Sequence, residues 1–110
     1  MTTIELDINI ITDGNLLLNP ERIILLREIK ETGSLLMASK KIGVSYNKVW
    51  TMLEEMNHAS DHKVVEKIRG GKGGGGAVLT DFGRIVLKEY NTIEQVVNQF
   101  TKKLNNDMNF

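Results

Sequence analysis

Seven consecutive residues, from Ser45 to Thr51, place hydroxyl, phenol, amide and amine groups at the start of a predicted helix. Asparagine can form two hydrogen bonds with the edge of adenine, and lysine can contact guanine or a phosphate. Hydroxyl groups and free backbone amides at a helix start favour phosphate oxygens. The stretch therefore predicts contacts to nucleic acid through Ser45, Tyr46, Asn47, Lys48 and Thr51.

A second stretch combines glycine with positive charge. Six of the seven positions 70–76 are glycine, and the seventh is Lys72. Strands are predicted on both sides, over 63–70 and 77–80, so the glycines would form the tip of a hairpin. Without Cβ atoms, their backbone amides can approach phosphates closely. We expect DNA contacts here from Arg69, Gly71, Lys72, Gly73 and Gly74.

Other chemistry finds little support. Lys72 is followed by glycine rather than serine or threonine, which excludes a nucleotide-binding P-loop. His58 and His62 have a spacing that could hold a metal, but a helix end is predicted between them, so we expect a solvated pair and no metal. No catalytic residue and no cofactor is predicted, and the chain is not expected to be an enzyme.

Capping residues divide the middle of the chain into three helices. Asn19 and Pro20 predict the start of the first helix, and Gly33 predicts its end. A second helix over 35–42 and a third over 46–59 are joined by a short turn in which Gly43 is expected to have a positive φ. This is the pattern of a helix-turn-helix. Expected phosphate contacts in or beside the second helix are Ser34, Lys40 and Lys41, with an ordinary solvated face as the alternative for the two lysines.

The two ends of the chain carry different periodicities. Residues 4–10 alternate between apolar and polar, which predicts a half-buried strand, followed by a turn at 13–15 and a return arm over 16–18. Thr80 and Asp81 predict the start of a last helix over 81–106. Its apolar residues follow a heptad seam that predicts a dimer interface of Val86, Tyr90, Ile93, Val97, Phe100 and Leu104. The alternative is packing on the domain's own core, with contributions from Ile85, Leu87 and Val96.

Together these elements predict one winged-helix domain over 1–110. It would be mainly α with small β: a winged helix-turn-helix with an N-terminal strand or hairpin and a long C-terminal dimerisation helix. We expect an N-terminal strand region over 1–18, the helix-turn-helix and wing over 19–80, and the last helix over 81–106.

Composition is compatible with this interpretation. The net charge is zero, but residues 34–76 carry seven basic and four acidic side chains, whereas residues 1–33 carry three basic and six acidic ones. A phosphate-binding face is therefore expected in the middle of the chain. The chain has no cysteine, no apolar run long enough for a membrane span and no signal-peptide pattern, so we expect a cytoplasmic protein without a membrane partner.

The stretches GSLLMASKKIGVSYNKVW, EMN and GGKGGGGAVLT, with FG after them, closely resemble the DNA-binding domain of the ModE family of bacterial molybdate-responsive transcriptional regulators. More broadly, the chain is similar to LysR-type winged helices. The resemblance implies a homodimer on an inverted-repeat operator, contacted through the residues of 45–51 and the wing. Family members often have lysine where Asn47 stands, so the resemblance does not give the operator sequence.

The expected function is that of a sequence-specific transcriptional regulator bound to double-stranded DNA, with a link to genes of molybdate or oxyanion transport. The resemblance also implies oxyanion-binding domains, which are expected to be absent from a stand-alone form such as this. Two alternatives stay open. One is a DNA-binding subunit that depends on a separate oxyanion-binding protein, and the other is a winged helix that binds protein through its acidic N-terminal third and last helix.

Overall fold

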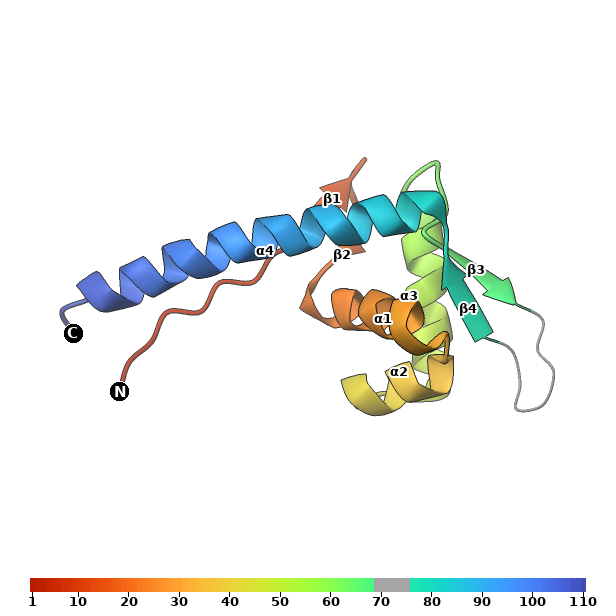
Figure 1. The fold of residues 1–110 in the computed structure, drawn as a ribbon, viewed down its shortest axis with the longest axis horizontal. Coiled ribbons are helices and arrows are strands. Elements are labelled where there is room, and N and C mark those ends of the chain that lie inside the picture. The colour runs from red at the N-terminus through yellow and green to blue at the C-terminus, as the bar shows by residue number, and fades with distance from the viewer. Residues whose placement is uncertain (69–75) are drawn as a thin grey trace.

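The computed structural model describes residues 1–68 and 76–110, and this part of the chain forms four helices and two antiparallel hairpins (Figure 1). The helices are α1 (Pro20–Thr32), α2 (Leu35–Ile42), α3 (Tyr46–Ala59) and α4 (Asp81–Asp107). The strands are β1 (Ile10–Thr12), β2 (Asn15–Leu18), β3 (Val65–Ile68) and β4 (Gly76–Leu79). The predicted order of elements is confirmed, and so is the mainly helical winged helix-turn-helix.

Every predicted helix start is confirmed by a side-chain cap. Asn19, Ser34, Ser45 and Thr80 each accept a hydrogen bond from the backbone N–H three residues later, at 2.8 to 3.1 Å. These bonds satisfy amides that have no partner inside the helix. Gly33 and Gly43 end α1 and α2 with left-handed φ angles of 68° and 81°.

The predicted strand over 4–10 is wrong for most of its length. Strand pairing starts only at Ile10, and the preceding segment runs extended beside α4 (Figure 1). The backbone N–H of Ile4 donates to Asn105 Oδ1 at 2.6 Å, and the Asn105 amide donates back to the Ile4 carbonyl at 3.1 Å. A period of two indicates that one face is covered, but it does not say whether a strand or a helix covers it.

The predicted N-terminal turn and return arm are confirmed. Asp13 and Gly14 form the two-residue connection between β1 and β2, and both have positive φ, 50° and 81°. The register shifts between Ile10 and Ile11, which leaves Leu17 as an extra residue of β2. Such a bulge breaks the alternation of faces, and Leu17 and Leu18 are accordingly both buried.

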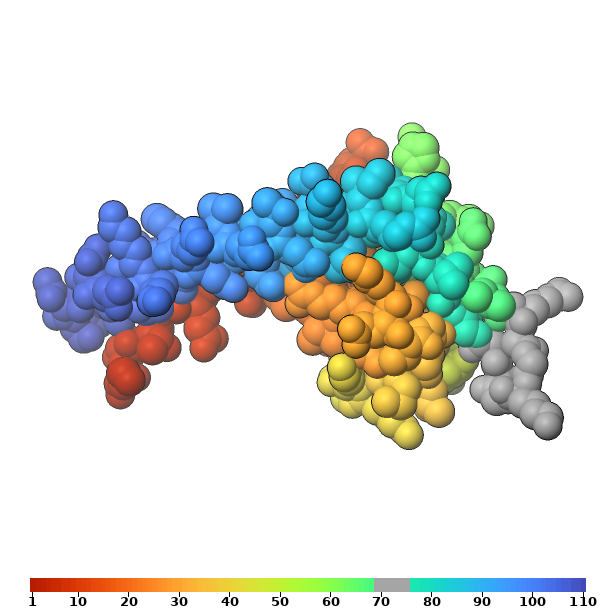
Figure 2. Space-filling model, viewed as in Figure 1, coloured from red at the N-terminus to blue at the C-terminus, as the bar shows by residue number. Residues whose placement is uncertain are grey.

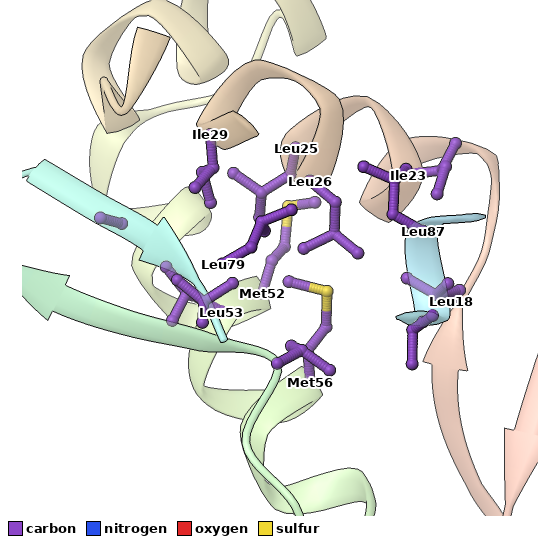
Figure 3. Close-up of a cluster of buried hydrophobic side chains, with 14 of the residues drawn as sticks. Leu18, Ile23, Leu25, Leu26, Ile29, Met52, Leu53, Met56, Leu79 and Leu87 are labelled. Atoms are coloured by element: carbon purple, nitrogen blue, oxygen red, sulfur yellow. The ribbon is translucent and has the colours of Figure 1, made fainter. Parts of the chain in front are cut away.

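The core lies where α1 crosses α3, closed by β2, β4 and the start of α4 (Figure 3). Ile23, Leu26 and Ile29 of α1 recur every third residue and are all buried. On α3 the buried stripe includes Val49, Leu53 and Met56. Ala38 and Ser39 are small and buried, which lets α2 pack closely against its neighbours.

Helix α4 has two unlike halves. Val86, Leu87 and Tyr90 are buried in the domain core. Of Ile85, Leu87 and Val96, which were expected to contribute to the core, only Leu87 does so, because Ile85 and Val96 are exposed. Glu94 accepts from Arg27 of α1 at 2.9 Å, and beyond this contact the second half extends away from the body, with residues 1–9 beside it (Figure 1 and Figure 2). The molecule consequently measures 56 × 29 × 21 Å. None of the helices in the described residues is both long and apolar enough to cross a membrane.

Candidate nucleic-acid interface

The helix-turn-helix brings the predicted 45–51 residues to the start of α3. Gly43 reverses the chain after α2, and the Ser45 hydroxyl accepts from the Lys48 N–H at 3.1 Å. Ser34 caps α2 in the same way by accepting from the Met37 N–H. Both hydroxyl oxygens therefore serve the helix starts, while each hydroxyl hydrogen can still be donated to another acceptor.

The first turn of α3 presents free polar groups to solvent. Tyr46, Asn47, Lys48 and Thr51 are all exposed. Thr51 donates its hydroxyl to the Asn47 carbonyl at 3.2 Å, so its side chain lies along the helix. Within the described residues, the side chains of Asn47 and Lys48 have no hydrogen-bond or ion-pair partner, which leaves an amide and an ammonium available to a ligand.

The acidic residues of α3 are paired with cations from other elements. Glu54 accepts from Lys67 of β3 at 2.9 Å, and Glu55 accepts from Arg22 of α1 at 2.8 Å. Arg22 is buried and also donates to the Leu16 carbonyl, so the second pair is fixed in place. Pairing both carboxylates lowers the repulsion that a nearby phosphate would meet.

The two lysines predicted on α2 lie in different surroundings. Lys41 Nζ is 3.0 Å from Glu28 Oε2, and the Glu28 carboxylate is buried. This hydrogen bond and the charge of Glu28 raise the pKa of Lys41. Lys40 is exposed and has no ion-pair partner among the residues described. Lys41 is therefore already engaged in the domain, and Lys40 is the freer cation.

Asn57, which the sequence marked only as part of a motif, holds the hairpin against α3. Its side-chain oxygen accepts from the N–H groups of Val64 and Val65 at 2.9 and 3.1 Å, and its amide donates to the Val65 carbonyl at 2.9 Å. Asparagine is a weak helix former, so its presence in the last turn of α3 is the only sequence signal that could have revealed this role.

Close backbone contacts fix the base of the β3–β4 hairpin. The Ala77 N–H donates to the Gly33 carbonyl at 3.0 Å, which joins β4 to the end of α1. A Cβ on Gly76 would lie 2.7 Å from that carbonyl oxygen, and a Cβ on Gly83 would lie 2.0 Å from the Val64 carbonyl oxygen. At these two positions glycine is required because another backbone occupies the space.

The predicted contacts of the hairpin tip, Arg69, Gly71, Lys72, Gly73 and Gly74, lie outside the described residues. Trp50 of α3 is half-buried against the core. Its ring lies under Lys67 Nζ, 4.1 Å from the ring centroid. His58 and His62 are exposed, and the described residues contain no cluster of three or more His, Cys, Asp or Glu suited to a metal ion.

The predicted dimer seam is divided between the two halves of α4. Val86 and Tyr90 are buried inside the chain's own core. On the second half, Ile93 and Phe100 are exposed, and Val97 and Leu104 are half-buried. Of the predicted seam, the structure therefore leaves Ile93, Val97, Phe100 and Leu104 accessible to a partner.

Known proteins match most of this chain. It is 40% identical over 89 residues to the DNA-binding transcriptional dual regulator ModE of Escherichia coli, a match that covers 81% of this chain and 34% of the relative. The chain is homologous to the N-terminal region of ModE. This ModE-like region spans only about a third of the length of the curated relatives it matches.

Two further relatives carry molybdenum in their names. The ModE-like region is 33% identical over 98 residues to the molybdenum transport protein ModE of Azotobacter vinelandii, which covers 86% of this chain and 36% of the relative. It is 40% identical over 91 residues to the molybdenum-pterin-binding protein MopB of Rhodobacter capsulatus, which covers 79% of this chain and 34% of the relative. No protein-family model matches the chain.

Proposed function

We propose that the chain is a sequence-specific DNA-binding transcriptional regulator that inserts α3 into the major groove. The observation that carries this proposal is the first turn of α3, where Asn47 and Lys48 are exposed beside a helix N-terminus. A helix of this kind presents its N-terminal residues to base edges in helix-turn-helix proteins. Homology to a region of a protein named as a DNA-binding transcriptional regulator supports the same function independently.

Each exposed group has a role in this proposal. Asn47 would bind adenine and Lys48 guanine or phosphate, while Tyr46, Ser45 and Thr51 add hydroxyl groups. Ser34 and Lys40 would contact the DNA backbone, with Lys41 contributing only if it leaves Glu28. The wing contacts, proposed from the sequence, are Arg69, Gly71, Lys72, Gly73 and Gly74.

The proposal includes a homodimer on an inverted repeat, formed through the second half of α4. Ile93, Val97, Phe100 and Leu104 would supply the contact, because their apolar side chains lie on a helix with little support from its own chain. Sedimentation velocity tests this directly. Phe100→Glu is expected to give a monomer, whereas Asn98→Asp, which adds the same charge on the same helix, keeps the dimer. A dimer that survives Phe100→Glu would place the interface elsewhere.

The relatives named for molybdenum suggest which genes to examine. We propose that the regulated genes include those of molybdate or oxyanion transport, with any oxyanion bound by a separate protein or by a part of the protein outside this sequence. The exposed apolar residues on α4 also favour a second function, a protein-interaction module that binds through this helix. Retention on heparin that is lost at moderate salt would favour DNA over that alternative.

Selection from a random-sequence DNA pool tests the function without knowledge of the operator. Gel shifts on the selected site and on a shuffled site then compare the wild type with Asn47→Ala, Lys48→Ala and Lys88→Ala. Lys88→Ala is the matched control because it removes the same charge from α4. We expect Lys48→Ala to cost about 1–3 kcal/mol on the selected site and to relax specificity there.

Three other results would change the conclusion. Equal weakening on both sites would make Lys48 a phosphate contact only. An equal loss in the Lys88 variant would indicate a non-specific charge effect. Failure of the folded, dimeric wild type to select any sequence would contradict sequence-specific regulation and favour the interaction module.

A further inference from the structure

A line of contacts joins β3 to the first turn of α3. Tyr46, Trp50 and Glu54 are spaced four residues apart, so they lie on one face of the helix. Lys67 of β3 lies against this face, with its Nζ 2.9 Å from Glu54 Oε1 and 4.1 Å from the centroid of the Trp50 ring. The edge contact between Trp50 and Tyr46, with centroids 6.1 Å apart and planes at 68°, continues the line.

The position of Lys67 is set by the backbone of the hairpin. Lys67 pairs with Ala77, which is buried, and Val65 on the same side of the strand is also buried. Asn57 holds the backbone of Val64 and Val65 against α3 through its three hydrogen bonds. This side of β3 therefore faces the domain, and the Lys67 ammonium is directed onto the Trp50 ring.

The network is better suited to orientation than to stability. Lys67 and Glu54 are each about half exposed, and ion pairs in such positions contribute little to folding. Restriction of the Trp50 rotamers is a separate effect, because a ring in contact with both Lys67 and Tyr46 has few other orientations. The hydrogen bond from Lys67 lowers the pKa of Glu54, which favours the charged carboxylate that this contact requires.

We propose that Lys67, held by Glu54, is a positioning residue that orients Trp50 and, through it, Tyr46 at the start of the recognition helix. Strand β3 thereby controls how α3 presents Tyr46 to DNA, in addition to any contact made by the hairpin tip. Tyr46 remains 37% exposed, so its phenol is available to a ligand while its ring packs against Trp50. This inference rests on the proposed DNA-binding function.

The first arm of the test uses free protein, since Trp50 is the only tryptophan. Lys67→Thr removes the ammonium and the stem while keeping a residue that suits a strand. Lys63→Thr is the matched control. Lys63 is also a positive charge that acts on Glu54, but within the described residues it makes no contact with an aromatic ring. We expect Lys67→Thr to increase acrylamide quenching of Trp50 and shift its emission, with an unchanged circular dichroism spectrum. The control should match the wild type.

The second arm measures the ratio of affinities for the selected and shuffled DNA sites. Charge alone predicts that Glu54→Gln strengthens binding to both sites, since it removes a carboxylate beside the DNA. Positioning predicts that Glu54→Gln and Lys67→Thr each lower the ratio about 3-fold, the factor expected for loss of an exposed cation–π contact. In a Tyr46→Ala background, Lys67→Thr should leave the ratio unchanged.

The outcomes separate this inference from the function on which it rests. If the wild type prefers no sequence, the proposed function fails, and the role of β3 in DNA recognition fails with it. If the wild type is specific but Lys67→Thr keeps both the Trp50 quenching and the full ratio, only the positioning inference is overturned. Equal weakening on both sites with unchanged Trp50 quenching would make Lys67 an ordinary phosphate contact.

Discussion

The two hairpins share one topology but are held in place by different means. β1 and β2 are joined by Asp13 and Gly14, a connection as short as a hairpin allows, and both residues have the positive φ that such a turn requires. β3 and β4 are joined by a much longer segment, residues 69–75. Their base is instead fixed by contacts from α1, α3 and α4.

This difference shows that hairpins of the same antiparallel topology can depend on local or on tertiary determinants. For β1–β2 the turn residues themselves select the pairing. For β3–β4 the determinants lie outside the hairpin: Asn57 of α3, Gly33 at the end of α1 and Gly83 of α4.

The largest expected effect is at the contact between α4 and the chain before β3. In Gly83→Ala the new Cβ would lie 2.0 Å from the Val64 carbonyl oxygen. This oxygen belongs to the backbone, so no change of side-chain rotamer can relieve the clash. We expect a loss of about 3 kcal/mol or more in the free energy of unfolding, because the helix or the strand must move. Urea unfolding followed by Trp50 fluorescence measures it. A loss below about 1 kcal/mol would show that the two backbones separate easily.

A slightly smaller effect is expected from removing the amide that joins α3 to β3. Asn57→Ala leaves the N–H groups of two buried residues, Val64 and Val65, without their acceptor. The expected loss in the free energy of unfolding is about 2–3 kcal/mol. Asn47→Ala on the same helix is the control, because that side chain is exposed, and it should change stability by less than about 0.5 kcal/mol. Equal stability of the two variants would remove Asn57 from the explanation of the hairpin's position.

The turn of the first hairpin should be more tolerant. Gly14→Ala meets no atom within 4 Å, so its cost comes only from the φ angle of +81°. We expect about 1 kcal/mol in thermal or urea unfolding, and less for Gly14→Asn, since asparagine tolerates this conformation. A loss as large as that of Gly83→Ala would mean that β1–β2 also depends on tertiary contacts.

The smallest effect concerns the ion pair that ties β3 to α3. Because Lys67 lowers the pKa of Glu54, this carboxylate adds stability above its unfolded pKa that is lost as the pH falls through the folded one. The pair is exposed, so the change in stability should be slight. A carbon-detected NMR titration should show the Glu54 pKa rising toward its ordinary value in Lys67→Thr. An unchanged pKa would show that the pair does not form in solution.

The sequence was a sufficient guide to most element boundaries. Asn19, Ser34, Ser45 and Thr80 cap the helices that the sequence predicts, and each cap acts within three residues of itself, so no distant contact is needed. The exposed residues of the α3 start follow from the same local logic, since the apolar stripe fixes which face is buried. The roles in DNA binding stay predictions.

The sequence failed where a residue's partner lies far along the chain. It did not show that the extended N-terminal segment would pair with Asn105 of α4 rather than with a strand. Nor did it show that Lys41 would be bound to Glu28, or that Val86 and Tyr90 would be used inside the domain core. Lysine and apolar residues suit several surroundings equally well, so their type alone does not select one.

By itself, therefore, the sequence determined the helices, their caps, the first turn and the family resemblance, because each of these depends on neighbouring residues or on motifs that can be read directly along the chain. Only the tertiary structure decided what lies beside each element: α4 beside residues 1–9, Asn57 against β3, and Lys67 over Trp50. These contacts join different elements of the fold, and their geometry is set by the packing of the whole core.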